Sequence, residues 1–178
     1  MGTEHSWILK RTAIMPKKIA LIDIDSERSW TYQLLSDEIY KWLAFFKTMG
    51  LQKNDRVAVI AENRIDLFAI LFACGIGGYI YVPLNWRLSE AELNYILEDC
   101  TPTLLIYEDR FISIVSRNSH IKAHPINEEL PIGKNNIDNN GNNSEDAWLL
   151  IYTGGTTGKP KGVVISYKAV NWNAFNTI

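Results

Sequence analysis

Apolar positions along the first hundred residues form two kinds of pattern. Short continuous runs rich in β-branched residues predict buried strands, and runs spaced at three and four residues predict amphipathic helices. The predicted strands cover residues 19–24, 56–61, 79–82 and 103–107. Strands that alternate with helices at this rhythm indicate crossover units in a mainly parallel sheet with helices on its faces. The predicted fold class is therefore α/β.

Local signals mark the ends of three predicted helices. Thr31 is placed to cap the first helix, and Gly50 suits the left-handed position that follows it. A second helix is predicted over residues 65–74. Ser89 begins a capping-box pattern that opens a third helix, which reaches about Asp99. The apolar face of the first helix consists of Leu35, Ile39, Trp42, Leu43 and Phe46.

The regular pattern fades between Ser116 and Asp146. Residues 135–143 are polar, rich in asparagine and without an apolar period, which predicts a mobile surface loop. Apolar runs resume at residues 147–152 and 162–166 and predict two more strands. The sequence therefore predicts three parts: a first α/β sheet subdomain over residues 1–115, an Asn-rich loop or linker over residues 116–146, and a hairpin with the start of the next helix over residues 147–178.

Composition places the 178-residue chain among globular proteins. Hydrophobic residues make up 47% and charged residues 21% of the chain, and the formal net charge is −2, so no basic excess points to nucleic acid. The N-terminus has no basic stretch followed by an apolar run, and no apolar run reaches the roughly 20 residues of a membrane span. The expected compartment is the cytoplasm, with neither a membrane span nor a nucleic-acid partner.

Other reactive residues give no catalytic or metal pattern. Cys74 and Cys100 lie far apart and have no histidine at ligand spacing, so they are predicted to be buried free thiols. Acidic pairs such as Glu98 and Asp99 are predicted to be solvated. The histidines are His5, His120 and His124. They fit no nucleophile or ligand motif and are predicted to lie on the surface or in loops, so the sequence predicts no catalytic residue and no metal site.

The segment between the last two predicted strands has the composition of a phosphate-binding loop. Its glycines lack Cβ atoms and let backbone N–H groups approach an anion. Its threonine hydroxyls can donate hydrogen bonds, its lysines add positive charge, and its proline stiffens the exit. The predicted ligand is therefore a polyphosphate. The predicted cofactor-binding residues are Thr153, Gly154, Gly155, Thr156, Thr157, Gly158, Lys159, Pro160, Lys161 and Gly162.

Two alternatives for this loop are a Walker A motif and a plain glycine turn. Walker A requires a first glycine and a final hydroxyl residue, whereas here Thr153 and Pro160 stand at those positions. The predicted setting between two strands also differs from the strand-to-helix setting of Walker A and dinucleotide motifs. A plain glycine turn would not need threonines and lysines in the same short segment. These observations favour a different kind of anion-binding loop.

Residues 152–162, Tyr-Thr-Gly-Gly-Thr-Thr-Gly-Lys-Pro-Lys-Gly, resemble the signature phosphate loop of the adenylate-forming (AMP-binding) superfamily. This superfamily includes acyl-CoA synthetases, aryl-CoA ligases, luciferases and the adenylation domains of peptide synthetases. Gly154 stands where the signature usually has serine, a substitution that also occurs among fatty-acyl-CoA synthetases. The resemblance covers nearly the whole chain, and the sequence Asn85-Trp86-Arg87-Leu88 is most common in acyl- and aryl-CoA ligases. Ser166-Tyr167 stands where many relatives have Thr-His.

The resemblance implies a layered αβαβα N-terminal domain of the acyl-CoA synthetase type, incomplete in this chain. It implies an AMP-forming ligase in which the carboxylate of a fatty or aryl acid attacks the α-phosphate of ATP, and coenzyme A then captures the acyl-adenylate. Mg²⁺ would accompany ATP. Thr153, Thr156, Thr157 and Lys161 would hold the β- and γ-phosphates. The implied partners are a small carboxylic acid, ATP and CoA, and a homo-oligomer is left open.

The family's segments for adenine, ribose and the acyl group, and its C-terminal lysine, have no match here. The chain is therefore expected to be a truncated N-terminal portion that is inactive alone. Two other interpretations stay open. One is an adenylation domain that loads a carrier protein, and the other is a non-catalytic phosphate-binding or assembly fragment completed by a partner chain.

Overall fold

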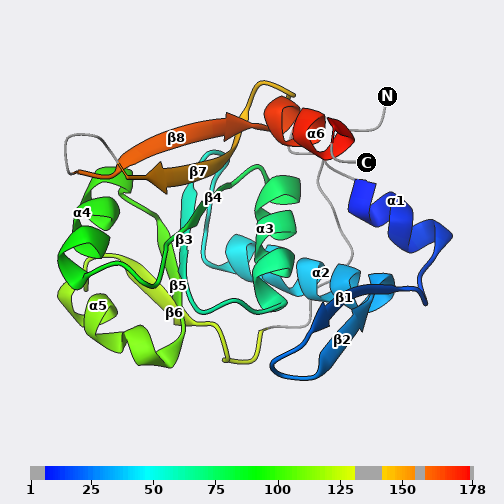
Figure 1. Ribbon diagram of the computed structural model, residues 1–178, viewed down its shortest axis with the longest axis horizontal. Coiled ribbons are helices and arrows are strands. Elements are labelled where there is room, and N and C mark those ends of the chain that lie inside the picture. The colour runs from blue at the N-terminus through cyan, green and yellow to red at the C-terminus, as the bar shows by residue number, and fades with distance from the viewer. Residues whose placement is uncertain (1–6, 131–141, 155–158, 177–178) are drawn as a thin grey trace.

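The computed structural model of the protein describes residues 7–130, 142–154 and 159–176. Its centre is a six-stranded sheet in the order β6-β5-β3-β4-β7-β8 (Figure 1). The first five strands in that order run parallel, and β8 is antiparallel to β7. The predicted α/β class with a mainly parallel sheet is confirmed. The strands are β3 (Arg56–Ile60), β4 (Ile80–Pro83), β5 (Leu104–Tyr107), β6 (Lys122–Pro125), β7 (Ala147–Thr153) and β8 (Lys161–Ser166).

Helices cover both faces of this sheet, which explains why its central strands are continuous apolar runs. Successive side chains of a strand point to opposite faces. On β3, Val57 and Val59 pack with α2 and α3, whereas Ala58 and Ile60 pack with α4 and α5. Figure 1 shows the sheet between these two pairs of helices. The helices are α2 (Tyr32–Thr48), α3 (Asp66–Gly77), α4 (Glu90–Cys100) and α5 (Ile112–Arg117), the last preceded by a 3-10 turn, η2 (Asp109–Phe111).

The predicted helix ends are largely confirmed. The Thr31 side chain accepts a hydrogen bond from the Leu34 amide at 3.2 Å, and the capping box of Ser89 is fully formed. All five predicted apolar positions of α2 are buried. The helix predicted to end at Cys74 instead continues to Gly77. Gly75 lies inside it and leaves room for the Trp148 ring. A Cβ atom at Gly75 would lie 2.6 Å from that ring.

A β-hairpin and a short helix at the N-terminal end were not predicted. The strand β1 (Ile19–Asp23) agrees with the prediction, but β2 (Arg28–Thr31), which pairs antiparallel with it, was not predicted. Its four residues mix polar and aromatic side chains and are half-buried or exposed, so they show no clear alternation. The helix α1 (Trp7–Ile14) buries only Ile8, which gives it little amphipathic signal.

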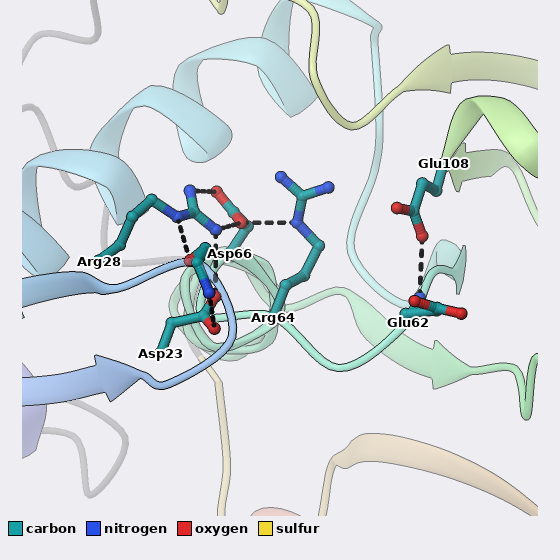
Figure 2. Close-up of polar contacts among 7 residues, drawn as sticks. Asp23, Arg28, Glu62, Arg64, Asp66 and Glu108 are labelled. Carbon is teal, nitrogen blue, oxygen red and sulfur yellow. Dashed lines mark hydrogen bonds and ion pairs between the residues drawn. The ribbon is translucent and has the colours of Figure 1, made fainter.

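An ion-pair cluster ties this hairpin to the first turn of α3 (Figure 2). Arg28 Nη2 lies 2.8 Å from Asp66 Oδ2 and 3.4 Å from Asp23 Oδ2, and Arg64 Nε lies 2.7 Å from Asp66 Oδ2. Burial alone would raise the pKa of Asp66, but the hydrogen bonds from Arg28 and Arg64 outweigh it and leave the pKa below 3.8. The carboxylate also lies at a helix N-terminus, where negative charge is stabilised.

The segment predicted as a loop or linker, residues 116–146, contains the strand β6. Lys122 and His124 are polar, so the four residues of this strand gave no apolar run. Strands on both sides of the segment join one sheet, and the division into three parts stays a prediction. Most of the predicted Asn-rich loop lies outside the described residues. Asn142, which is described, donates from Nδ2 to the Gly75 carbonyl at 3.2 Å near the end of α3.

The two cysteines are free and buried, as predicted. His120 is exposed, and His5 lies outside the described residues. The prediction for His124 was wrong, because its side chain is only 12% exposed and its ring lies 4.2 Å from the ring of Phe45. In the part of the chain that the structure describes, no helix is long and apolar enough to cross a membrane.

Candidate phosphate-binding site

The predicted loop connects the ends of the β7–β8 hairpin. The last residue pairs before the loop are Tyr152 with Gly162 and Thr153 with Lys161, so the predicted strand-to-strand setting is confirmed. The loop begins at the carboxyl end of β7, which runs parallel to β4 and β3. Ligands of parallel α/β sheets bind outside the carboxyl ends of the strands. The fold therefore places the loop at the sheet edge that suits a ligand.

The described residues of the loop are open to an approaching anion. Thr153, Gly154, Lys159 and Lys161 are exposed. A Cβ atom built at Gly154 would have no neighbour within 4 Å among the residues that the structure describes. Of the other predicted site residues, Pro160 is half-buried and Gly162 is exposed, whereas Gly155, Thr156, Thr157 and Gly158 lie outside the described residues.

Gly162 has a packing role that the sequence did not indicate. A Cβ atom at this position would lie 2.9 Å from Leu150 Cδ1, 3.2 Å from Tyr152 Cζ and 3.3 Å from Tyr152 Oη. The missing side chain therefore leaves space for the Tyr152 ring to lie against the paired strand. This space lets the tyrosine side chain extend across β8 rather than away from it.

Two side chains of α4 contact the two ends of the loop. The Tyr152 hydroxyl, before the loop, donates to Asp99 Oδ2 at 2.5 Å, and Lys159 Nζ, near the end of the loop, lies 5.4 Å from the centre of the Tyr95 ring. Burial raises the pKa of Tyr152, and the hydrogen bond to Asp99 raises it further. Asp99 is exposed, but the prediction of a merely solvated carboxylate missed this contact, which depends on how α4 packs beside β7.

The opposite end of the hairpin, its base, is fixed to α3 through buried side chains. Trp148 Nε1 donates to the Leu71 carbonyl at 3.0 Å, and the Tyr167 hydroxyl donates to the Gly75 carbonyl at 2.7 Å. The two aromatic rings are stacked, with centroids 5.2 Å apart. Tyr167 is the first residue of α6 (Tyr167–Asn176). In this chain it is a buried packing residue.

A cleft of about 250 Å³ adjoins the loop at the carboxyl ends of β3, β4 and β7. Its lining includes Asn63, Asn85, Trp86, Arg87, Ile151 and Tyr152. The Trp86 ring contacts two guanidinium groups, those of Arg87 at 4.3 Å and Arg110 at 5.3 Å. The sequence did not mark these as site residues. Trp86 and Arg87 follow a predicted parallel strand, and this position could have identified them as site residues.

The Arg110 side chain, which contacts the Trp86 ring, has a second contact. Arg110 forms an ion pair with Glu62, the residue whose backbone amide donates to Glu108 Oε2 at 3.0 Å. Figure 2 shows the Glu62 and Glu108 contact, which joins the loops after β3 and β5. The described residues contain no group of three histidine, cysteine or acidic side chains that could hold a metal ion. The cleft therefore offers aromatic, amide and guanidinium groups.

Sequence comparison decides the family. The chain matches the family described as AMP-binding enzyme over residues 9–178. This protein belongs to the AMP-binding enzyme family. The prediction that the chain belongs to the adenylate-forming (AMP-binding) superfamily is therefore confirmed.

Several AMP-binding relatives are ligases by name. The chain is 32% identical to the indoleacetate–CoA ligase of Aromatoleum aromaticum, over 97% of this chain and 36% of that protein. It is 29% identical to a feruloyl-CoA synthase of Amycolatopsis sp, over 97% of this chain and 35% of that protein. It is 31% identical to the fatty acid–[acyl-carrier-protein] ligase ScoC of Streptomyces coeruleorubidus, over 80% of this chain and 29% of that protein. The chain thus spans about a third of the length of these relatives.

Solved structures have the same fold. The inhibitor-bound N-terminal domain of FACL13 from Mycobacterium tuberculosis superposes with a TM-score of 0.86 at 22% identity, over 96% of this chain and 46% of that chain. The AMP complex of the o-succinylbenzoate coenzyme A synthetase MenE from Bacillus subtilis superposes with a TM-score of 0.78 at 24% identity. The superposition covers 96% of this chain and 44% of that chain. The predicted fold, part of an acyl-CoA synthetase N-terminal domain, is confirmed.

Proposed function

We propose that this chain supplies the ATP-phosphate-binding part of an AMP-forming acid–CoA ligase. The observation that carries the proposal is an exposed loop of glycines, threonines and lysines at the carboxyl edge of the sheet, in a member of the AMP-binding family. In this proposal the backbone and side chains of residues 153–162 surround the β- and γ-phosphates. Thr153, Thr156, Thr157 and Lys161 are the principal side-chain ligands.

The proposed chemistry has two steps. A carboxylate oxygen of the acid attacks the α-phosphorus of ATP, and the bond from that phosphorus to the bridging oxygen breaks, which releases pyrophosphate. The thiol of coenzyme A then attacks the acyl carbon and displaces AMP. The loop transfers no proton; it holds the leaving pyrophosphate in place and offsets its negative charge. Mg²⁺ would add charge neutralisation, and we assign no residue of this chain to it.

The names of the relatives support a fatty or aryl acid as the substrate. Indoleacetate and ferulate are aromatic acids, and the ScoC relative is named for a fatty acid. ScoC also supports a second candidate function, in which a carrier protein replaces CoA as the acyl acceptor. Both candidates share the first step and hence the same role for the loop. The proposed compartment is the cytoplasm, where ATP and CoA are available.

The test uses a protein of the relatives' length that contains this chain. AMP release is measured with a panel of fatty and aromatic acids, ATP, and either CoA or a carrier protein. Lys161→Ala is expected to lower kcat/KM for ATP by about 100-fold, because one fixed charge on the leaving group is lost. Lys10→Ala, an exposed lysine of α1, is the matched control and should leave the rate unchanged. An absence of AMP with every acid, or equal rates for the two variants, would contradict the proposal.

The isolated 178-residue chain is expected to make no acyl-adenylate. The groups that would bind the adenosine and the acyl chain have no match in its sequence, so the carboxylate cannot be positioned for attack. Exchange of labelled pyrophosphate into ATP measures this reaction directly. Exchange above the level of a heat-denatured sample would show that the chain contains a complete adenylation site.

An assembly role is a further candidate, supported by apolar side chains that the hairpin and the helix after it expose. Val164 on β8 is 65% exposed, and Trp172 and Phe175 on α6 are 61% and 70% exposed. Exposed apolar patches of this kind mark contact surfaces. Sedimentation of the chain tests this candidate. The assembly role predicts self-association or binding of a complementary chain, and sedimentation as a monomer under all conditions would argue against it.

A further inference from the structure

Helix α4 is a rigid support beside the phosphate loop. Its N-terminus is closed by the capping box, in which the Glu92 amide donates to Ser89 Oγ at 3.3 Å and the Ser89 amide donates to Glu92 Oε2 at 2.9 Å. Leu93, Ile96 and Leu97 are buried against the sheet. Tyr95 and Asp99 are four residues apart and therefore lie on one face of the helix. This face meets both ends of the loop.

The contact before the loop depends on three residues. The Tyr152 hydroxyl donates to the Asp99 carboxylate, which makes a charge-assisted hydrogen bond of the stronger kind. Gly162, directly across the hairpin from Tyr152, has no side chain that would displace the tyrosine ring. The backbone of Tyr152 precedes Thr153, the first proposed phosphate ligand. Fixing the tyrosine ring therefore fixes where the loop begins.

The contact near the end of the loop separates the roles of the two lysines. Lys159 Nζ lies over the Tyr95 ring, within the distance at which a cation is attracted by an aromatic face. Lys161 is exposed, and in the part of the chain that the structure describes its ammonium has no ion-pair partner. Lys159 is thus engaged with α4, while Lys161 remains available to a ligand.

From these contacts we propose that Tyr95 and Asp99 of α4 are positioning residues, which hold the two ends of the phosphate loop through Lys159 and Tyr152. Lys159 is then an anchor of the loop, and Lys161 is its main cationic ligand. The inference rests on the proposed function for the identity of the ligand, a polyphosphate. The anchoring itself is a property of the ligand-free chain and can be measured without any ligand.

The decisive comparison is between neighbouring carboxylates on α4. Asp99→Ala removes the acceptor for Tyr152, whereas Glu98→Ala removes an exposed carboxylate beside it and serves as the matched control. Inorganic tripolyphosphate is titrated into the 178-residue chain by calorimetry, and thermal unfolding is followed in parallel. If Asp99 acted only through its charge, its removal would strengthen binding of an anion. If Asp99 positions the loop, its removal weakens binding by about fivefold, as expected for the loss of one hydrogen bond.

Further variants separate positioning from general stability. Tyr152→Phe should weaken tripolyphosphate binding as much as Asp99→Ala, and the double variant should be no weaker than either single variant. Asp99→Asn keeps an acceptor and should restore most of the affinity. Tyr95→Phe keeps the ring and should bind normally, whereas Tyr95→Leu should not. A lower unfolding temperature with unchanged affinity would reduce Tyr95 and Asp99 to structural residues and overturn the inference.

Hydrogen exchange distinguishes failure of this inference from failure of the proposed function. In the ligand-free chain, Asp99→Ala should speed exchange of the Thr153 and Lys161 amides, and Glu98→Ala should not. Equal exchange in the two variants would overturn the anchoring whatever the ligand. If exchange changes as expected but wild-type protein does not bind tripolyphosphate, the anchors stand and the proposed ligand is wrong.

Discussion

The two ends of the β7–β8 hairpin are held in different ways. At the base, Trp148 and Tyr167 are almost fully buried and donate hydrogen bonds to carbonyl groups of α3. At the tip, the contacts of Tyr152 and Lys159 with α4 lie at the surface. Buried contacts contribute most to stability, whereas exposed ones contribute little. The hairpin therefore combines a base that stabilises the fold with a tip whose surface contacts position the loop at little cost in stability.

The largest expected effect is at the base. Trp148→Ala removes a buried ring and its hydrogen bond to Leu71, and should lower the free energy of unfolding by about 3–5 kcal/mol. Trp172→Ala, at an exposed position of α6, is the control and should change it by less than about 0.5 kcal/mol. Urea unfolding followed by circular dichroism measures both. Similar losses in the two variants would contradict the proposed difference between base and surface.

The pH dependence of stability tests the packing around Cys100, the last residue of α4. Burial raises the pKa of the Cys100 thiol from 9.0 to about 11. A group whose pKa is raised in the folded state stabilises the fold below its unfolded pKa, and this contribution disappears as the pH rises through the folded pKa. Stability should therefore fall between pH 9 and pH 11, by up to about 3 kcal/mol from this group. Cys100→Ala should flatten the decline measured by urea unfolding, and an unchanged slope would contradict the assignment.

Glycine substitutions compare the two ends directly. Gly75→Ala places a Cβ atom 2.6 Å from the Trp148 ring, so the ring must shift and stability should fall by about 1–3 kcal/mol. Gly154→Ala meets no atom within 4 Å at the tip and should leave stability nearly unchanged. Thermal unfolding measures both variants. A larger loss at Gly154 than at Gly75 would reverse the comparison.

The smallest effects concern two tyrosine hydroxyls. Tyr167→Phe removes a buried hydrogen bond to the Gly75 carbonyl and should cost about 1 kcal/mol of stability. Tyr152→Phe removes an exposed contact with Asp99 and should cost less than about 0.5 kcal/mol. Because each change removes one oxygen atom, unfolding free energies of the two variants can be compared without correction for size. Equal costs would mean that the tip is as firmly held as the base.

Much of the fold could be predicted from the sequence, because its central strands are buried on both faces and its helices carry clear caps. The strands β2 and β6 were missed for a common reason. Each is only four residues long and contains charged or polar side chains, so neither shows an apolar run. Their positions are set by pairing with β1 and β5, which are tertiary contacts without a local signal.

The site could be predicted only in part. The composition of residues 153–162 indicated a phosphate loop because its chemistry is concentrated in one segment. The supporting residues Tyr95 and Asp99 come from α4, and the cleft residues Trp86 and Arg87 follow β4. Only the tertiary packing of these elements beside β7 brings them near Tyr152. A carboxylate in a helix has no sequence feature that distinguishes a solvated group from one that holds a tyrosine.

Titration of the isotopically labelled chain with inorganic tripolyphosphate, followed by NMR, tests the central claim most directly. We predict saturable shifts of the Thr153, Gly154 and Lys161 amides at the tip, no shifts of the Trp148 and Tyr167 amides at the base, and roughly tenfold weaker binding by Lys161→Ala. Shifts spread evenly over both ends of the hairpin, or equal binding by wild type and Lys161→Ala, would contradict the assignment of this loop as the phosphate site.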